Sequence, residues 1–282
     1  MKIVISSIVL FMFITVISHS QQKRSCCEET SAPQRMALLG NDQSFRDAHP
    51  TPIAFTLTGG NGSMITFNTP DGKTANGYEV RSANTSDKWI LVFHEWYGLN
   101  DYIKKECEEL RDSLGNVNVL AIDLYDGKVA SNNEEASKYV QSVDVIRAVN
   151  IIKGAADYAG SSAVLGTLGW CFGGAWSLQT AIELGSGVKA CVMYYGMPED
   201  SKDRLAKLQA PILGIFGKKD GHITPEIVSK FEDNMKSAGK TITVYSYDAV
   251  HAFANPSNPL HDPEATKDAK AKTLQFFRDN LK

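Results

Sequence analysis

Cys171 stands at the centre of a glycine-rich segment, residues 166–174, that reads Gly-Thr-Leu-Gly-Trp-Cys-Phe-Gly-Gly. An apolar run precedes this segment and helix-forming apolar residues follow it, which predicts a strand, a tight turn and a helix. The thiol then occupies the apex that serine takes in a G-x-S-x-G turn, where Gly169 and Gly173 leave room for the adjoining strand and helix. A helix N-terminus next to Cys171 favours the reactive thiolate. The alternative is a glycine-rich turn around a buried structural cysteine.

An acid and a histidine follow two later apolar runs, at the positions where a nucleophilic thiol needs them. Asp220 comes just after the run 212–216, and His251 just after the run 241–247. Nucleophile, acid and histidine in this chain order are typical of α/β-hydrolases. In that arrangement His251 accepts the proton of Cys171, and Asp220 fixes the tautomer and orientation of the imidazole.

Other residues compete for the roles of base and acid. His222 is the rival base, but it lies two residues from Asp220 on the same loop, so it is poorly placed to bridge acid and nucleophile. Asp248 and Asp262 are rival acids, although neither stands on the separate loop that this chain order requires. The sequence favours Asp220 and His251 and leaves the others open.

The loop after residues 89–93 reads His-Glu-Trp-Tyr-Gly and begins at His94. In an α/β-hydrolase this loop supplies one amide of the oxyanion hole, and the residue after the nucleophile supplies the other. The backbone N–H groups of Trp96 and Phe172 are therefore the predicted oxyanion donors. The spacing of His94 and Glu95 does not match a metal site, so no metal is predicted.

Short apolar runs alternate with amphipathic segments of helical length from residue 62 onward. This alternation predicts an α/β fold, with a mostly parallel twisted sheet of about eight strands flanked by helices. In such a sheet ligands bind beyond the carboxyl ends of the strands, where the residues above occur. The predicted strands are residues 64–67, 77–80, 89–93, 117–122, 163–168, 188–195, 212–216 and 241–247, and the predicted helices are residues 100–114, 133–158, 174–185, 225–238 and 263–281.

The chain has 282 residues and a net charge of −3, without long runs of one sign, which argues against nucleic acid or a membrane surface as partner. Residues 1–20 resemble a signal peptide, so we expect export to the periplasm or the medium and no membrane association after cleavage; an uncleaved anchor is the alternative. Residues 21–60 are polar without sustained periodicity and predict a leader segment, followed by one domain at 61–282. Five cysteines are few for a disulfide scaffold, and the adjacent pair Cys26-Cys27 has no assigned role.

Five motifs in unbroken order give the chain a family resemblance. They are Gly-Trp-Cys171-Phe-Gly-Gly, His-Glu95-Trp-Tyr-Gly, Asp123-Leu-Tyr-Asp-Gly-Lys, Lys-Asp220-Gly-His and Val-His251-Ala-Phe. Together they resemble dienelactone hydrolase (carboxymethylenebutenolidase) over about residues 62–281. The resemblance implies a single-domain α/β-hydrolase without metal or organic cofactor and with a triad of Cys171, Asp220 and His251. It also implies that Glu95 pairs with the resting thiol and swings away when substrate binds; a loop carboxylate held by backbone amides is the alternative.

The sequence departs from the family where arginines bind a substrate carboxylate. Asn255 stands at one of those positions, and the segment 131–140 that would carry the other contains no arginine. A substrate carboxylate would lose its bidentate partners, which argues against a carboxylate-bearing lactone as substrate. The predicted substrate pocket is apolar and aromatic, and each of its members has the plain core as alternative. It comprises Tyr97, Tyr125, Trp170, Phe253 and Asn255, next to Trp96 and Phe172.

These residues predict an exported, cofactor-free thiol hydrolase that cleaves a small-molecule carboxylic ester or lactone through an acyl-enzyme on Cys171. A thioesterase or another acyl hydrolase on the same scaffold is one alternative, because a fold does not fix a substrate. A binding protein that has kept the fold without turnover is the other. The expected assembly is a monomer or a small homo-oligomer.

Overall fold

A computed structural model describes residues 30–282, and their core is one eight-stranded sheet in the order β1-β2-β4-β3-β5-β6-β7-β8. Strand β2 pairs antiparallel with both β1 and β4, and every other pairing is parallel. The α/β fold with about eight strands, predicted from the sequence, is confirmed. The strands are β1 (Ser63–Asn68), β2 (Thr74–Val80), β3 (Lys88–Phe93), β4 (Asn118–Ile122), β5 (Val164–Trp170), β6 (Val188–Tyr194), β7 (Ile212–Gly217) and β8 (Ile242–Tyr247).

Burial along the strands follows their place in the sheet. The central strands β3, β4, β5, β6 and β7 are buried along almost their whole length, as strands covered on both faces must be. The edge strand β8 instead alternates between partly buried and exposed residues. The continuous apolar runs of the sequence therefore mark the centre of the sheet.

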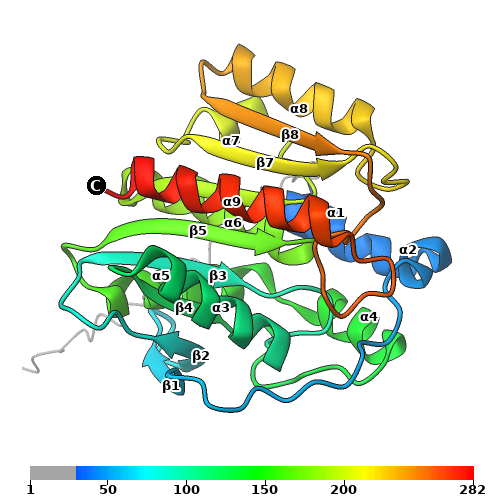
Figure 1. Cartoon of the computed structure of the whole chain (residues 1–282). Coiled ribbons are helices and arrows are strands. Elements are labelled where there is room, and N and C mark those ends of the chain that lie inside the picture. Colours follow the sequence, from blue (N-terminus) through cyan, green and yellow to red (C-terminus); the bar gives the residue numbers. More distant parts are fainter. Residues whose placement is uncertain (1–29) are drawn as a thin grey trace, which may run out of the picture.

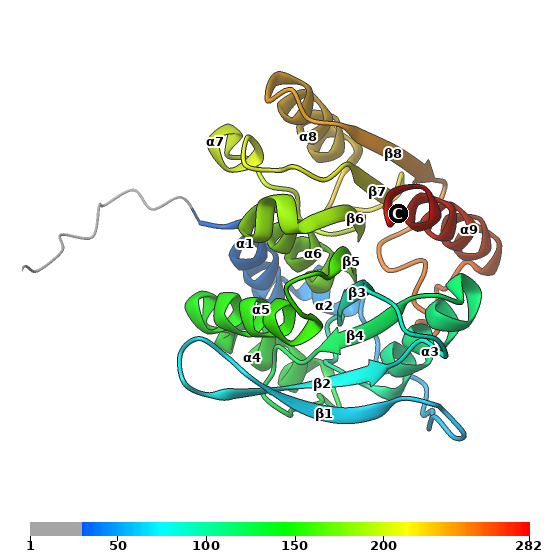
Figure 2. The same ribbon diagram turned by 90° about the vertical axis from the view of Figure 1, so that its left-hand side faces the viewer.

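Helices cover both faces of the sheet. Helices α3 and α9 pack on one face, and α5, α6 and α8 on the other, as the view along the sheet in Figure 2 shows. These layers enclose one continuous core. The longer helices are α3 (Asp101–Leu114), α4 (Asn133–Ser142), α5 (Val145–Ala159), α6 (Phe172–Leu184), α8 (Pro225–Ser237) and α9 (Pro263–Asn280).

The single helix predicted over 133–158 is wrong, because the structure has two helices there, α4 and α5. Val143 is extended between them, and the Asp144 side chain accepts a hydrogen bond from the Arg147 amide as the N-cap of α5. An aspartate at this position starts a new helix more favourably than it continues an old one. The structure also contains the four-residue helix α7 (Lys202–Leu205), which the sequence patterns did not indicate.

The chain ahead of the sheet forms two short helices, α1 (Ala32–Leu38) and α2 (Gln43–Asp47), joined by a 3-10 turn, η1 (Leu39–Asn41). We call residues 30–49 the N-terminal strap. Helix α1 packs against α6, and Figure 1 shows α2 on the side of the sheet toward which the arrows of β5, β7 and β8 point. The strap thus crosses the carboxyl edge of the sheet, although its sequence predicted only a leader without periodicity.

The predicted signal peptide (1–20), the first part of the predicted leader (21–29) and the pair Cys26-Cys27 lie outside the described residues. Within residues 30–282, no helix combines the length and the apolar character that crossing a membrane demands.

Candidate active site

Cys171 lies at the apex of the predicted turn, between β5 and α6. Its backbone adopts φ 54° and ψ −117°, a left-handed conformation that a non-glycine residue holds only under strain. The glycines on either side are required: a Cβ atom on Gly169 would lie 2.0 Å from the Gly173 carbonyl oxygen, and one on Gly173 would lie 2.2 Å from the Phe93 carbonyl oxygen. The sequence motif therefore builds a nucleophile elbow, and the strain presents the thiol beyond the end of the strand.

Asp220 and His251 meet at the same edge of the sheet, from the loops after β7 and β8. The His251 Nδ1–H donates to Asp220 Oδ2 at 2.6 Å, and both side chains are buried. Asp220 Oδ1 also accepts hydrogen bonds from the amides of His222 and Ile223, at 2.8 and 2.9 Å. Burial raises the pKa of Asp220, but His251 and these two amides outweigh it and hold the pKa below its usual value. Asp220 is therefore the charged acceptor that orients His251.

The rival residues have other partners. Asp248 is 77% exposed and pairs with Lys219, while Asp262 caps the first turn of α9 through the Ala265 amide. His222 is only partly buried, and its contact with Asp220 is made through its backbone amide. Their positions favour Asp220 and His251 over these alternatives.

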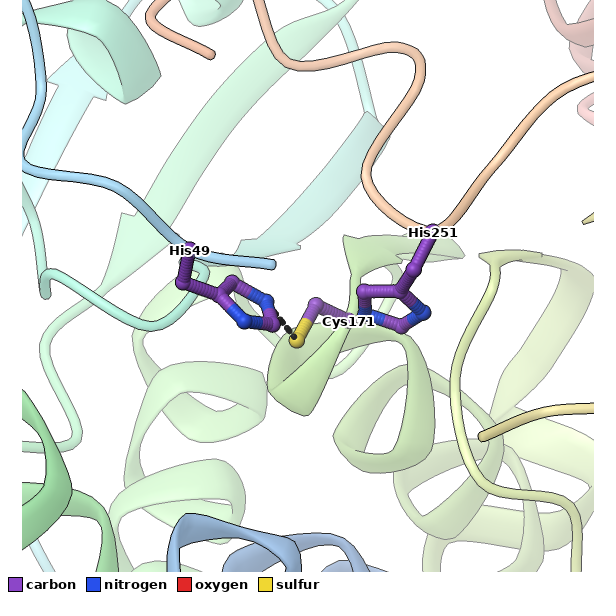
Figure 3. A group of neighbouring side chains, drawn as sticks. All are labelled: His49, Cys171 and His251. Atoms are coloured by element: carbon purple, nitrogen blue, oxygen red, sulfur yellow. Dashed lines mark hydrogen bonds between the residues drawn. The ribbon is translucent and has the colours of Figure 1, made fainter. Parts of the chain in front are cut away.

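The thiol lies between two histidines, one of which the sequence analysis did not consider. His49, the last residue of the strap, has its Nε2 atom 3.4 Å from Cys171 Sγ. One ring nitrogen of each histidine and the Cys171 sulfur lie within 4.8 Å of one another. Figure 3 shows the two rings approaching the sulfur from different sides, one from the strap and one from the loop after β8. The base predicted from the motif and a second imidazole thus share one nucleophile.

Hydrogen bonds settle which nitrogen of His49 carries its proton. The Nδ1 atom lies 2.7 Å from the Phe45 carbonyl oxygen, which can only accept, so Nδ1 is the donor. Burial, reinforced by the neighbouring His251 ring, lowers the pKa of His49 to about 3. His49 is therefore neutral near pH 7, and its Nε2 lone pair accepts the hydrogen bond from the Cys171 S–H group.

The resting sulfur is a thiol and not a thiolate. Burial raises the pKa of Cys171 well above its usual value, the charge of Glu95 adds to this, and the Phe172 amide opposes it only in part. The helix N-terminus next to Cys171 favours the thiolate, as the sequence predicts. Desolvation of the fully buried sulfur raises its pKa by more than this helix effect lowers it. A base must therefore take the proton before Cys171 can attack.

Glu95 lies in a buried network at the edge of the site. Its two carboxylate oxygens accept hydrogen bonds from Tyr195 Oη at 3.2 Å and from Asn255 Nδ2 at 2.7 Å. Burial raises the pKa of Glu95 to about 7, against the effect of these two donors. Its charge acts on Cys171, while the hydrogen bond of the resting thiol goes to His49. Pairing of Glu95 with the thiol stays a prediction.

One of the two predicted oxyanion donors lies at the elbow. Phe172 is the first residue of α6, and its backbone amide lies against the Cys171 sulfur. The Trp96 side chain is buried and donates from Nε1 to Asn133 Oδ1 at 2.7 Å, which fixes the loop after β3. His94 connects this loop to the chain after β4, since its Nε2 accepts a hydrogen bond from the Leu124 amide at 3.1 Å. Its Nδ1 atom contacts the Glu95 carbonyl oxygen at 2.9 Å, so both ring nitrogens have partners and neither is free to bind a metal.

The aromatic residues of the predicted pocket divide into two groups. Tyr97, Trp170 and Asn255 line a small cavity of about 20 Å³ beside Glu95. Phe253 and Tyr125 are buried in the core, Phe253 against Tyr195 and Tyr247, and Tyr125 against His94 and Phe172. The first group borders open space next to the site.

Helix capping signals could have located the strap in the sequence. Ser31 and Gln34 form a capping box at the start of α1, and the Asp42 side chain caps α2 by accepting from the Ser44 amide at 2.8 Å. The helices that follow have seven and five residues, too few for a hydrophobic period to show. The contact between His49 and Cys171 spans 122 residues and has no local signature.

A strained nucleophile elbow at the carboxyl edge of a mostly parallel sheet, next to an aspartate-bound histidine, defines the protein as an α/β-hydrolase. Residues 75–281 match the dienelactone hydrolase family. The chain belongs to this family and is a hydrolase.

Similar proteins cover most of the chain. The protein usf of Aquifex pyrophilus is 29% identical over 78% of this chain and 99% of its own length. A carboxymethylenebutenolidase of Pseudomonas sp. (strain P51) is 29% identical over 67% of this chain and 83% of its own length. Among solved structures, a dienelactone hydrolase-like promiscuous phosphotriesterase from metagenomic libraries has a TM-score of 0.68 at 21% identity, covering 79% of this chain and all of that one. The last likeness shows the shared fold alone.

Proposed function

We propose that the protein cleaves an uncharged carboxylic ester or lactone through a covalent acyl-enzyme on Cys171. The observation that carries this proposal is the position of His251, whose Nδ1 is held by Asp220 and whose ring offers a nitrogen within 4.8 Å of the sulfur at the strained elbow. The Nε2 atom of His251 is buried and has no hydrogen-bond partner among the described residues. An imidazole held in this way is a general base without a competing partner.

In the proposed reaction His251 Nε2 takes the Cys171 proton and the sulfur attacks the carbonyl carbon. The amides of Trp96 and Phe172 stabilise the oxyanion, and loss of one such donor costs about 3–4 kcal/mol of activation free energy. The leaving alcohol takes its proton from His251, and water activated by the same residue then releases the acid. Every step uses groups of the chain alone.

The surroundings support an uncharged substrate. Asn255, at the position where the family resemblance places an arginine, is bound to Glu95, and Tyr97 and Trp170 border the adjoining cavity. A substrate carboxylate brought beside Glu95 would meet a second acid without a guanidinium partner. A neutral ester or lactone avoids this repulsion. The similarity to a carboxymethylenebutenolidase supports the reaction class, and the aromatic surroundings favour an apolar substrate.

Substrate entry requires movement of the strap. Cys171 has no exposed surface, and the ring of Phe45, also without exposed surface, packs against His49, His251 and Trp96. A carbonyl carbon can reach the sulfur only after these side chains separate. The strap is accordingly a cover over the nucleophile, and its opening precedes the chemistry.

Replacement of the nucleophile tests the function. Cys171→Ala is expected to lower the hydrolysis of 4-nitrophenyl acetate at least about a thousandfold, as removal of a catalytic nucleophile does. Cys107→Ala is the matched control, because Cys107 is also a buried free cysteine but lies in α3. Circular dichroism verifies that both variants fold. Undiminished activity of the Cys171 variant would show that the elbow is not the catalytic site.

We also propose that the protein is exported and acts after removal of residues 1–20. The support is the charged, apolar and small-residue order of that segment. N-terminal sequencing of the protein from its producing cells tests this, and a chain that retains Met1 would contradict it.

A further inference from the structure

The two histidines at the nucleophile offer more ligand atoms than ester hydrolysis uses. One ring nitrogen of His49, the Cys171 sulfur and one ring nitrogen of His251 lie within 4.8 Å of one another, and all three residues are buried. The triad chemistry needs only the Cys171–His251 pair. Figure 3 shows that the sulfur lies between the rings, so His49 completes a three-atom cluster of nitrogen and sulfur.

The other nitrogen of each imidazole is held by an acceptor. His49 Nδ1 donates to the Phe45 carbonyl oxygen at 2.7 Å, and His251 Nδ1 donates to Asp220 Oδ2 at 2.6 Å. Both Nε2 atoms therefore carry lone pairs toward the sulfur. Histidines that bind metal ions show this same arrangement, in which a carbonyl or carboxylate fixes the tautomer and the ring orientation.

An unpartnered group points into the cluster. His251 Nε2 is buried, the residue is 3% exposed, and the atom has no hydrogen-bond partner within residues 30–282. A buried acceptor without a donor is unfavourable, and a ligand that accepts its lone pair would remove this cost. This observation is independent of the distance between His49 and Cys171.

We propose that His49, Cys171 and His251 form a three-ligand site for a thiophilic divalent cation, zinc in particular, with water in the fourth position. One sulfur and two imidazole nitrogens suit tetrahedral zinc with an open coordination position. With metal–ligand bonds of about 2.3 Å to sulfur and about 2.0–2.1 Å to nitrogen, the S···N separation in a tetrahedron is roughly 3.5 Å. The separation between His49 Nε2 and Cys171 Sγ is already 3.4 Å. The ring of His251 also offers a nitrogen within 4.8 Å of both other ligand atoms.

Binding exchanges one proton for the metal. The Cys171 S–H bond breaks, the sulfur electron pair forms the bond to the cation, and the proton leaves to the buffer. The two imidazoles, each with its Nδ1–H held by an acceptor, give their Nε2 lone pairs to the cation. The bound cation then occupies both the nucleophile and the lone pair of the base, so it shuts off hydrolysis reversibly; this consequence rests on the proposed function, whereas the binding does not.

Cobalt(II) is the direct probe, because it takes the same tetrahedral geometry as zinc and absorbs visible light. All proteins carry Cys26→Ser and Cys27→Ser, so that no other cysteine pair contributes. Under anaerobic conditions we expect one equivalent of cobalt to give a thiolate-to-cobalt charge-transfer band and intense tetrahedral d–d bands, both abolished by one equivalent of zinc. Loss of the charge-transfer band in Cys171→Ser would identify the sulfur.

The histidine variants separate this site from adventitious binding. His49→Gln is expected to weaken cobalt binding by more than about a hundredfold, because loss of a ligand exceeds the 10–100-fold cost of losing a supporting residue. His222→Gln is the matched control, since its ring also packs on Phe45 but lies outside the cluster. It should bind cobalt as the parent does. Equal cobalt binding by both variants, or the lack of a charge-transfer band in the parent, would contradict the proposed site. Thermal melts test whether each variant folds. If His49→Gln does not fold, His49→Ala replaces it.

Zinc inhibition is measured separately with 4-nitrophenyl acetate. We expect the parent to lose activity with one equivalent of zinc and to recover it with a chelator, and His49→Gln to need at least tenfold more zinc for the same inhibition. A parent that binds cobalt as described but hydrolyses no ester would contradict the proposed function and leave the metal site standing. A parent that hydrolyses esters without any cobalt spectrum would do the reverse.

Discussion

The catalytic edge is assembled from two regions that differ in how the sequence encodes them. Cys171, Asp220 and His251 each lie within four residues of the end of a strand, so the sheet itself brings them together. The strap reaches the same place from the start of the described chain, ahead of the region that matches the family, and contributes Phe45 and His49. In the proposed reaction the strand ends supply the reactive groups, while the strap covers them and adds a second imidazole. The proposal thus assigns chemistry to one region and access to the other.

Replacement of the acid tests the first half of this comparison and has the largest expected effect. Asp220→Asn removes the charge that orients His251 and should lower ester hydrolysis by about 10⁴-fold, the loss typical of such a change in a triad. Alkylation of Cys171 by iodoacetamide, followed by mass spectrometry, should show the thiol as inaccessible as in the parent. Asp248→Asn is the control, because that rival acid is an exposed partner of Lys219. A similar loss in both variants would place the acid elsewhere.

Removal of the Phe45 ring tests the second half. Phe45 is fully buried against His49, His251 and His222, so Phe45→Ala should destabilise the closed strap by about 3–5 kcal/mol. The rate of Cys171 alkylation should then rise at least about a hundredfold, since every 1.4 kcal/mol changes an equilibrium tenfold. Phe55→Ala is the matched control, because Phe55 is 39% exposed and packs on Tyr102. An unchanged alkylation rate in Phe45→Ala would mean that the strap does not limit access.

Local sequence predicted the strand ends because their signals lie next to the residues they position. Apolar runs located all eight strands, and the elbow followed from glycines within two residues of Cys171. The family resemblance added the role of Glu95, whose charge does act on the thiol. The prediction of a single helix across α4 and α5 was wrong because Asp144, which caps α5, was taken as part of a longer helix.

The strap and the protonation state of the thiol could not be predicted in the same way. His49 is one of six histidines in the chain, and its importance comes from a contact across 122 residues. The pKa of Cys171 depends on burial, which only the packed structure defines, and burial there outweighs the Phe172 amide. Long-range packing, and not local pattern, decides both features.

The stability contributions of a buried acid beside the strand ends and of a buried histidine in the strap should change with pH in opposite directions. Burial raises the pKa of Glu95 from 4.5 to about 7, so the native state holds a proton that the unfolded chain releases. Its contribution to stability is full below pH 4.5 and is lost as the pH rises through 7, by at most about 3 kcal/mol. In Glu95→Gln this loss between pH 4.5 and 7 should vanish, whereas it should persist in Glu134→Gln, an exposed control in α4. Urea unfolding across this range measures it; identical slopes in both variants would contradict the buried-acid account.

His49 supplies the opposite sign within the strap. Burial, with the neighbouring His251 ring, lowers its pKa from 6.5 to about 3, while Asp220 opposes the shift. The contribution of neutral His49 is full above pH 6.5 and is lost as the pH falls toward 3. The parent should therefore lose stability on acidification through this range and His49→Gln should lose less. Greater acid sensitivity of His49→Gln would show that the strap is not held by a neutral imidazole.

The anchor of the strap gives the smallest expected effect. Arg35 in α1 pairs with Asp200 at 3.3 Å and donates to the Pro198 carbonyl oxygen, which ties the strap to the chain after β6. Because the arginine is 26% exposed and Asp200 is 46% exposed, the pair contributes no more than about 1 kcal/mol. Arg35→Met should thus raise the rate of Cys171 alkylation severalfold. Added to Phe45→Ala, in which the strap is already open, it should leave the alkylation rate unchanged. Arg278→Met is the matched control, since Arg278 also donates to a backbone carbonyl, that of Ser113, but joins α9 to α3. If both arginine variants accelerate alkylation equally, the change reflects global stability and not release of the strap.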